Sequence, residues 1–458
     1  LIMVLAMVPA LADDPLSGTC GAVGNEANVT WKLEQNNTDT ANPTYTLTIF
    51  GSGAMADYNG WRSQPWKGYA EKITRFVVEE GVTVIGQSAT DGENMIAEYD
   101  IGKSVETIKD FGISTYSATT FNLNGNTKFN VVDGVLFSAD GKTLYAYPGG
   151  RAEIEVYNVP SDVTRINGGA FNGAKMKKLI FGNNSIDIAS WTFQGCTAEY
   201  MELNGTNLSG SESFRHFSKL KYLKIAGGSI PSQFFCGVGW TFGPNTAAIE
   251  KISISKLPTG NRPFFLQYKL TTVDLSQCGN VGSASEGLFC DTGYTVKDSN
   301  YKPIGKRISK ITFYFNTADD AESFKNNKGA YYNKTTATDE YESNDIFAVL
   351  NGGSIPSTEG WYNGKKYTDG DGLEIEEGQF VLATPVRPGY NFDGWYTNAD
   401  FSGDLVTTVE EAGGTYYAKW TEKPQEQQPT PTPYNGGGNG GGYYHPTTTP
   451  VPVIVIPP

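Results

Sequence analysis

The sequence predicts a mainly β solenoid in which each repeat contributes one short strand to a parallel sheet. Three observations predict this fold. Short apolar-x-apolar segments recur at intervals near 22 residues, and a second apolar pattern follows them in phase. The composition, with 13% aromatic residues and 54 glycines, suits strands and turns better than a bundle of helices.

Ten segments carry the apolar-x-apolar pattern. They begin at Phe76, Tyr99, Phe121, Tyr157, Leu179, Met201, Leu223, Ile252, Val273 and Ile311. Successive starts are separated by 23, 22, 36, 22, 22, 22, 29, 21 and 38 residues, so six of the nine intervals lie between 21 and 23. One such unit cannot bury its apolar side alone, so the units must stack and share a core. The outer residues of each triplet then face the core, and the middle residue faces solvent.

The second apolar pattern lies in the segment that leads from the strand of one repeat back to the strand of the next. Apolar residues lie four and seven positions after three of the triplets, as Val82 and Ile85, Val105 and Ile108, and Val163 and Ile166. Several units also place an aromatic residue before a turn, as at Phe171, Phe193 and Phe289. These positions predict an apolar turn or short helix that closes each repeat against the shared core.

Four stretches carry a family resemblance. The segment 159–171, VPSDVTRINGGAF, and the turn 193–196, FQGC, resemble the BspA-like leucine-rich repeats of bacterial surface proteins. Residues 129–148 resemble the hairpin that interrupts these repeats, and residues 47–66 resemble the amino-terminal cap of the family. The resemblance covers residues 18–315 and weakens after Gly227. It implies a leucine-rich-repeat solenoid with a β cap.

A second module follows the repeats. Its elements are Asn351-Gly352-Gly353, Pro388-Gly389-Tyr390, Gly394-Trp395-Tyr396 and Tyr417-Ala418-Lys419-Trp420. These elements resemble the Listeria–Bacteroides repeat of internalin B, which implies a small β-grasp-like module. Glycine-aromatic pairs at strand ends fit hairpins that close on a small aromatic core.

These features divide the chain into six parts. We expect a signal peptide remnant at 1–12, an N-terminal β capping region at 13–70, a solenoid at 71–315 with a hairpin insertion at about 128–148, a cap and linker at 316–345, the Listeria–Bacteroides module at 346–421, and a spacer at 422–458. A short helix near Ala318–Asn326 would end the solenoid.

The ends of the chain indicate where it acts. Residues 1–12, LIMVLAMVPALA, read as the second half of a secretory signal peptide, with a buried strand or helix as the alternative. Residues 422–458 are rich in Pro, Thr and Gly, which is typical of an extended spacer. We therefore expect an extracellular protein at the bacterial cell surface, wall-anchored or released, with no membrane insertion of the mature chain.

The composition argues against several functions. A net charge of −14 disfavours nucleic acid as a partner. The two histidines, His216 and His445, leave no basis for a histidine triad or a histidine-rich metal site. The five cysteines form no CxxC pair, and we expect structural thiols, with redox or disulfide roles as the alternative: Cys20, Cys196, Cys236, Cys278 and Cys290.

No motif in the sequence indicates a cofactor, metal or catalytic site. The run Gly51-x-Gly53-x-x-Ala56 is followed by turn formers where a dinucleotide loop needs a helix, and 369–372 fails the calcium-loop pattern. The 49 acidic residues contain no motif that selects a pair for glycoside hydrolysis. We expect no catalytic residue, cofactor or metal, and hence no enzyme.

The stacked strands predict a binding surface. The middle residues of the triplets form one column, and the residues before the triplets form a second. Tyrosines and charged side chains gather there, and we expect the ligand-binding residues to be Lys178, Tyr200, Glu202, Tyr222, Lys224, Lys251 and Asp274. Interfaces favour aromatic anchors. The alternative is an ordinary solvated sheet face.

These observations predict a monomeric surface adhesin that binds an extracellular protein or glycan, with host matrix as one source of the ligand. A structural spacer in the cell wall is the second reading. A protein accessory to carbohydrate processing is the third. Identification of a ligand in a binding experiment would distinguish the adhesin from the structural spacer.

Overall fold

The computed structural model describes residues 16–210, 214, 217–232, 234–235, 249–260, 263–264, 267, 270–284, 287–289, 307–309, 311–327, 341–343, 345–355, 382–406, 409 and 414–424. The expected signal peptide at 1–12 and the spacer from residue 425 onward lie outside these residues. Within the described residues, no helix is both long and apolar enough to cross a bilayer.

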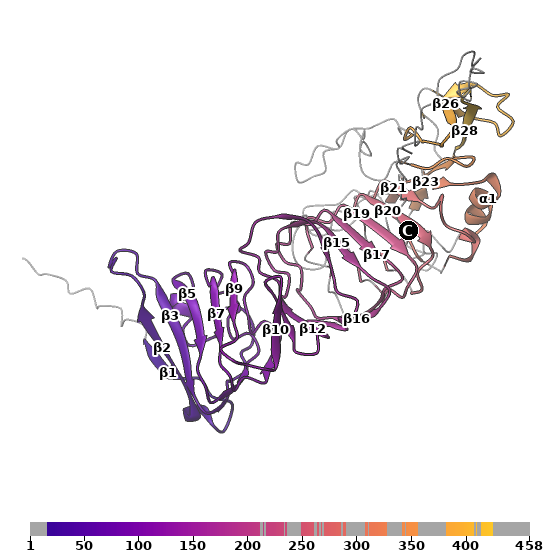
Figure 1. Cartoon of the computed structure of the whole chain (residues 1–458). Helices are drawn as coiled ribbons and strands as arrows, with labels where there is room; N and C mark the ends of the chain where they lie inside the picture. The colour runs from indigo at the N-terminus through magenta and orange to yellow at the C-terminus, as the bar shows by residue number, and fades with distance from the viewer. Residues whose placement is uncertain are drawn as a thin grey trace, which may run out of the picture.

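The fold is mainly β, with parallel strands that follow one another along an elongated molecule from β2 and β3 at one end to β26 and β28 at the other (Figure 1). The first sheet has the order β1-β2-β3-β5-β7-β9. Its strands are β1 Ser17–Thr19, β2 Val29–Gln35, β3 Tyr45–Gly51, β5 Ile73–Val78, β7 Glu98–Ile101 and β9 Thr120–Asn122. Strands β1 to β3 are antiparallel, and the pairing becomes parallel from β3 to β5.

The second and longest sheet has the order β13-β15-β17-β19-β20-β21-β23-β25-β28-β26-β27. Its strands are β13 Ile154–Asn158, β15 Met176–Phe181, β17 Tyr200–Leu203, β19 Tyr222–Ala226, β20 Lys251–Lys256, β21 Thr272–Asp274, β23 Thr312–Phe315, β25 Ile346–Val349, β28 Thr415–Glu422, β26 Tyr390–Tyr396 and β27 Leu405–Val406. All pairs are parallel until β28, which pairs antiparallel with β26.

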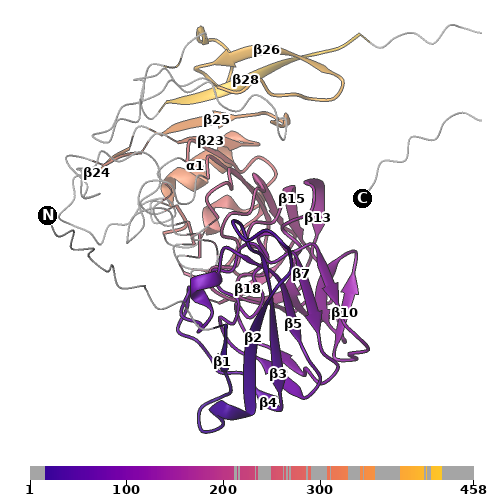
Figure 2. The same ribbon diagram turned by 90° about the vertical axis from the view of Figure 1, so that its left-hand side faces the viewer.

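The returning halves of the repeats form their own ladders. One contains β4 Gly53–Ala54, β6 Val82–Ile85 and β8 Thr107–Ile108. The other contains β10 Phe129–Val132, β11 Val135–Ser138, β12 Thr143–Ala146, β14 Arg165–Ile166, β16 Ser185–Ile188 and β18 Asn207–Ser209. Strands β10 to β12 are antiparallel, whereas β12 pairs parallel with β14 and so returns the chain to the repeat. Figure 2 shows β10 beside the strands of the first sheet.

The remaining elements are short. Strands β22 Arg307–Ser309 and β24 Tyr341–Ser343 pair with each other, and single 3-10 turns occur at Glu26–Asn28, Lys67–Tyr69 and Val281–Ser283. Helix α1 spans Ala318–Asn326, where the sequence favours a helix. A capping box starts it, with Thr317 and Asp320 bonding each other's backbone N–H. Its Phe324 is fully buried against Phe313, at a ring distance of 5.0 Å, and so covers the end of the solenoid core.

The expected apolar positions form the core. The residues four and seven places after the triplets are all buried: Val82, Ile85, Val105, Ile108, Val163 and Ile166. The aromatic residues before the turns stack from one repeat to the next, as Phe171 and Phe193 do at 5.4 Å and Phe193 and Phe214 at 4.8 Å. The predicted solenoid is therefore confirmed, with its repeats joined by a continuous aromatic ladder.

The structure corrects the predicted columns in two places. Strand β9 pairs only with β7 and β13 only with β15, so the column divides between Asn122 and Asn158 where the hairpin strands are inserted. At the last rung, Asp274 pairs with Tyr314 and Thr272 with Thr312. The expected neighbour of Asp274 was Thr312, so the prediction was out of register by two residues.

Candidate functional site

Most of the predicted surface lies on three consecutive strands. Strands β15, β17 and β19 are parallel and in register, so Lys178 stands beside Tyr200, which stands beside Tyr222. In the adjacent column Glu202 stands beside Lys224. We call these five residues the strand-face cluster.

The strand-face cluster is linked by its own side chains. The Tyr200 hydroxyl donates to Glu202 Oε2 at 3.1 Å, and Lys224 Nζ donates to Glu202 Oε1 at 2.8 Å. Lys178 Nζ lies 5.3 Å from the centre of the Tyr200 ring, within the range of a cation–π contact. Burial, with Glu202 as the next cause, raises the pKa of Tyr200, so this phenol stays protonated and can donate.

The positions of these side chains follow from the core behind them. Met201 and Leu203 on β17, and Leu223 and Ile225 on β19, are almost completely buried. Successive residues of a strand point to opposite faces, so burial of these four holds the alternate residues outward. All five members of the strand-face cluster remain partly exposed.

Two predicted site residues are not accessible. Lys251 continues the column beside Tyr222, but it is only 5% exposed, and Asp274 is 7% exposed. Burial lowers the pKa of Lys251 to about 7, with the charge of Asp274 opposing the shift. Asp274 Oδ1 accepts hydrogen bonds from the Ser276 N–H and hydroxyl groups. The expectation that both face solvent is therefore wrong.

The outer face of the longest sheet is covered toward its C-terminal end. On β23 and β25, Phe313 and Phe347 enter the solenoid core, while Tyr314 and Ile346 enter a separate core on the opposite face. That second core contains Trp395, whose indole N–H donates to Ala383 O, while the Ala383 N–H donates to Tyr314 Oη. The C-terminal strands thus cover the sheet face there and leave it open at the strand-face cluster.

The open face has two further features. Val156, the residue before the triplet at Tyr157, belongs to the predicted second column; it lies beside Lys178 in register and is 39% exposed. Ion pairs also cross between rungs, from Lys177 to Glu155 at 2.6 Å and from Lys221 to Glu199 at 2.9 Å. The spacing of 22 residues within each pair is the signal that could have identified them.

Among the described residues, no group of three or more His, Cys, Asp or Glu side chains could hold a metal ion. Cys20, Cys196 and Cys278 are buried free thiols, and burial raises the pKa of Cys196 to about 12. His216, His445, Cys236, Cys290 and the turn 369–372 lie outside the described residues.

Comparison with known proteins identifies the repeats. The BspA type leucine-rich repeat region matches residues 145–256 in six copies, a span that includes all five residues of the strand-face cluster. No curated protein sequence matches the chain.

Solved structures were also matched. A leucine-rich repeat protein from Eubacterium ventriosum is 17% identical over 61% of this chain and 85% of its own, with a TM-score of 0.25. A leucine-rich cell surface protein from Faecalibacterium prausnitzii is 14% identical over 57% of this chain and 95% of its own, with a TM-score of 0.30. The pneumococcal vaccine antigen PcpA is 14% identical over 71% of this chain and 99% of its own, with a TM-score of 0.26.

Proposed function

Starting from a chain that carries BspA-type leucine-rich repeats at residues 145–256, we propose that this protein is an exported bacterial cell-surface adhesin. It binds an extracellular protein or glycan through the strand-face cluster and acts as a monomer. The apolar segment 1–12 directs its export, and the Pro/Thr/Gly-rich segment 422–458 holds the repeats away from the cell.

One observation carries this proposal. Tyr200, Tyr222, Lys178 and Lys224 stand side by side on three strands whose opposite faces are buried in the core. Tyrosine offers a large contact area with few rotatable bonds, and a rigid sheet has already lost its backbone freedom. Binding at this surface therefore costs little conformational entropy.

The charges on the cluster suggest the character of the ligand. Lys178 and Lys224 contribute two positive charges and Glu202 one negative charge, so the cluster is net positive by one within a chain of net charge −14. Nucleic acid remains disfavoured because the whole chain repels phosphate. A protein with exposed carboxylates, or a glycan with hydroxyl and acidic groups, complements the tyrosine and lysine side chains.

The C-terminal module has a supporting role in this proposal. We assign residues 346–421 to a Listeria–Bacteroides type of module. The contacts of Trp395 and Tyr314 with Ala383 favour a module that terminates the sheet over one that binds a ligand of its own.

The proposal is tested by a binding screen of the full chain against extracellular-matrix proteins and a glycan array. A test variant carries Tyr200→Ala, Tyr222→Ala and Lys224→Ala. A control variant carries Lys103→Ala and Val132→Ala, two exposed positions away from the cluster. A ligand bound by the wild type and the control but lost by the test variant supports the proposal. A ligand kept by all three contradicts the assigned surface, and the absence of any ligand favours a structural spacer.

A further inference from the structure

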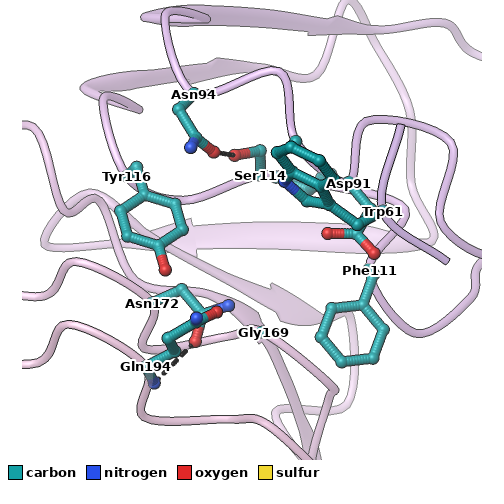
Figure 3. A pocket seen from close by; sticks show the side chains of 11 residues that line it. Trp61, Asp91, Asn94, Phe111, Ser114, Tyr116, Gly169, Asn172 and Gln194 are labelled. Atoms are coloured by element: carbon teal, nitrogen blue, oxygen red, sulfur yellow. Dashed lines mark hydrogen bonds between the residues drawn. The ribbon is translucent and has the colours of Figure 1, made fainter. Parts of the chain in front are cut away.

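A small pocket lies away from the strand-face cluster, among the turns that close the first repeats (Figure 3). It has a volume of about 130 Å³. Its lining comes from five segments far apart in sequence, at Trp61, 91–94, 111–116, 169–172 and Gln194. No residue of the strand-face cluster contributes to it.

The pocket contains a hydrogen-bond donor whose orientation is fixed. Asn172 Oδ1 accepts the backbone N–H of Gln194 at 2.9 Å. A backbone N–H can only donate, so the oxygen of the Asn172 amide must face it. The Nδ2 group therefore faces the other way, and no acceptor for it occurs in the described part of the chain. Asn172 as a residue is only 7% exposed, but its Nδ2 atom is open to the pocket, so water or a ligand there can accept from it.

Other polar groups surround the same space. A side chain at Gly169 would lie 3.3 Å from Asn172 Nδ2, so the glycine keeps the approach to this amide open. Asn94 uses its Oδ1 to accept from Ser114 at 3.3 Å, which leaves its Nδ2 group for the pocket. Burial, with the charge of Asp91 as the next cause, raises the pKa of Tyr116 to about 12, so its phenol is a donor as well.

Aromatic rings form the walls. Figure 3 shows Tyr116 across the opening from Trp61 and Phe111. Trp61 is 65% exposed, although an indole of this size is usually well covered. A Cβ atom at position 92 would lie 2.8 Å from the Trp61 indole nitrogen, so Gly92 is needed for the ring to stand where it does.

The amide donors, the aromatic rings and the single carboxylate of the pocket together fit one class of ligand. Asp91 is the single charged residue in the lining, so an anion would be repelled. A cation would satisfy Asp91 and the rings but would leave the amide donors of Asn94 and Asn172 without acceptors. A purely apolar group would desolvate those donors without bonding them. A sugar ring has hydroxyl groups that both donate and accept and an apolar face that packs on an aromatic ring.

We propose that this pocket is a second binding site, which takes one neutral sugar residue of a glycan. Arg62 lies over one face of the Trp61 ring, at 4.6 Å from its centre, and the other face packs against the sugar ring. Asn172 Nδ2 and Asn94 Nδ2 donate to the hydroxyl oxygens of the sugar, and Asp91 accepts from a hydroxyl group. The site is independent of the strand-face cluster, so the protein can hold a glycan at one place and a second partner at another.

Saturation-transfer NMR on the full chain tests the proposal with glucose, galactose, mannose, N-acetylglucosamine and N-acetylgalactosamine as probes, and with choline as the cationic comparison. Two variants remove separate parts of the site. Trp61→Ala removes the exposed ring, and Asn172→Asp keeps the oxygen that holds the Gln194 N–H while removing the amide donor. Met95→Ala is the control, because Met95 is an exposed apolar neighbour that does not line the pocket.

We expect at least one sugar to bind the wild type and Met95→Ala alike, and Trp61→Ala and Asn172→Asp each to weaken it by about tenfold or more, a change equivalent to about 1.4 kcal/mol. If Asn172→Asp does not fold, Asn94→Asp replaces it as the polar variant, because it removes the second amide donor and keeps the oxygen that accepts from Ser114. Three results would overturn the proposal: no sugar binds, a bound sugar is unaffected by both pocket variants, or choline binds in place of the sugars. The triple variant of the strand-face screen leaves this pocket intact, so a glycan that it still binds but that Trp61→Ala loses belongs to the pocket, and the two proposals fail separately.

Discussion

Lys224 Nζ lies 2.8 Å from Glu202 Oε1, across two strands that are paired in register. The Glu202 side chain is 16% exposed and that of Lys224 is 43% exposed, so water competes with the ion pair. Such pairs contribute little to stability. The ion pair therefore orients Lys224 on the open face more than it holds the fold together.

The first prediction concerns this pair. Lys224→Ala should lower the free energy of unfolding by less than about 1 kcal/mol, because a partly exposed ion pair is weak. Urea denaturation followed by circular dichroism measures the change. A loss well above 2 kcal/mol would mean that the strand-face cluster is structural, and binding data from its variants would then need a separate check of folding.

The second prediction concerns the aromatic ladder. Phe193 is completely buried and stacks on Phe171 at 5.4 Å and on Phe217 at 5.1 Å. Phe193→Ala should destabilise the protein by about 3–5 kcal/mol, through lost burial and the cavity that remains. Phe193→Leu, which keeps more of the volume, is the control and should cost clearly less.

Hydrogen exchange would localise that damage. A solenoid repeat contacts mainly its neighbours, so faster exchange should be concentrated in β14, β16 and β18 and in the adjoining strands of the parallel sheet. Uniform acceleration along the whole described chain would instead show that the repeats unfold as one unit.

The third prediction concerns a buried acid. Glu93 is inaccessible to solvent, and neither carboxylate oxygen has a hydrogen-bond partner among the described residues. Burial, with Asp91 as the next cause, raises the pKa of Glu93 to about 8 from its ordinary value of 4.5. Between these values the folded state keeps the proton and the unfolded state loses it. Stability should therefore fall by a few kcal/mol as the pH rises from about 4.5 to 8.

Glu93→Gln is the matched variant, because its side chain cannot ionise. Thermal melting across this pH range should give a flatter dependence for Glu93→Gln than for the wild type, whatever the absolute stability of the variant. Identical slopes for the two proteins would show that Glu93 ionises freely in the fold.

The fourth prediction concerns the thiols. Burial raises the pKa of Cys20 and Cys196 to about 12 and that of Cys278 to about 11, so thiolate is scarce at neutral pH. Iodoacetamide at pH 8 should label these three residues only after unfolding. Mass spectrometry of the separate peptides reads each site. Rapid labelling of Cys196 in the native protein would contradict its place in the core.

Periodicity in the sequence predicts the solenoid because it reports burial directly. Val82 and Ile85 are apolar where the second ladder needs apolar residues, and both are fully buried. At the last rung the pattern is ambiguous, since 311–313 and 313–315 both read as apolar-x-apolar. Both faces of β23 are buried, so alternation could not say which residues enter the solenoid core.

The candidate site was predictable only in part, for a related reason. Tyr200 and Tyr222 are partly exposed, whereas Lys251 and Asp274, on the next two strands of the same sheet, are buried. Local spacing sets the direction of a side chain but not what packs over it. The pocket around Asn172 could not be predicted from the sequence either, because its five segments meet only in the folded chain.

The central claim is that ligands dock on the strand-face cluster. Hydroxyl-radical footprinting tests it directly, with the first ligand identified by the binding screen. We expect oxidation of Tyr200 and Tyr222 to fall when the ligand is added, while oxidation of the exposed Met95 on the turn side stays constant. Unchanged oxidation of both tyrosines in a saturated complex would contradict the claim and place the ligand elsewhere on the protein.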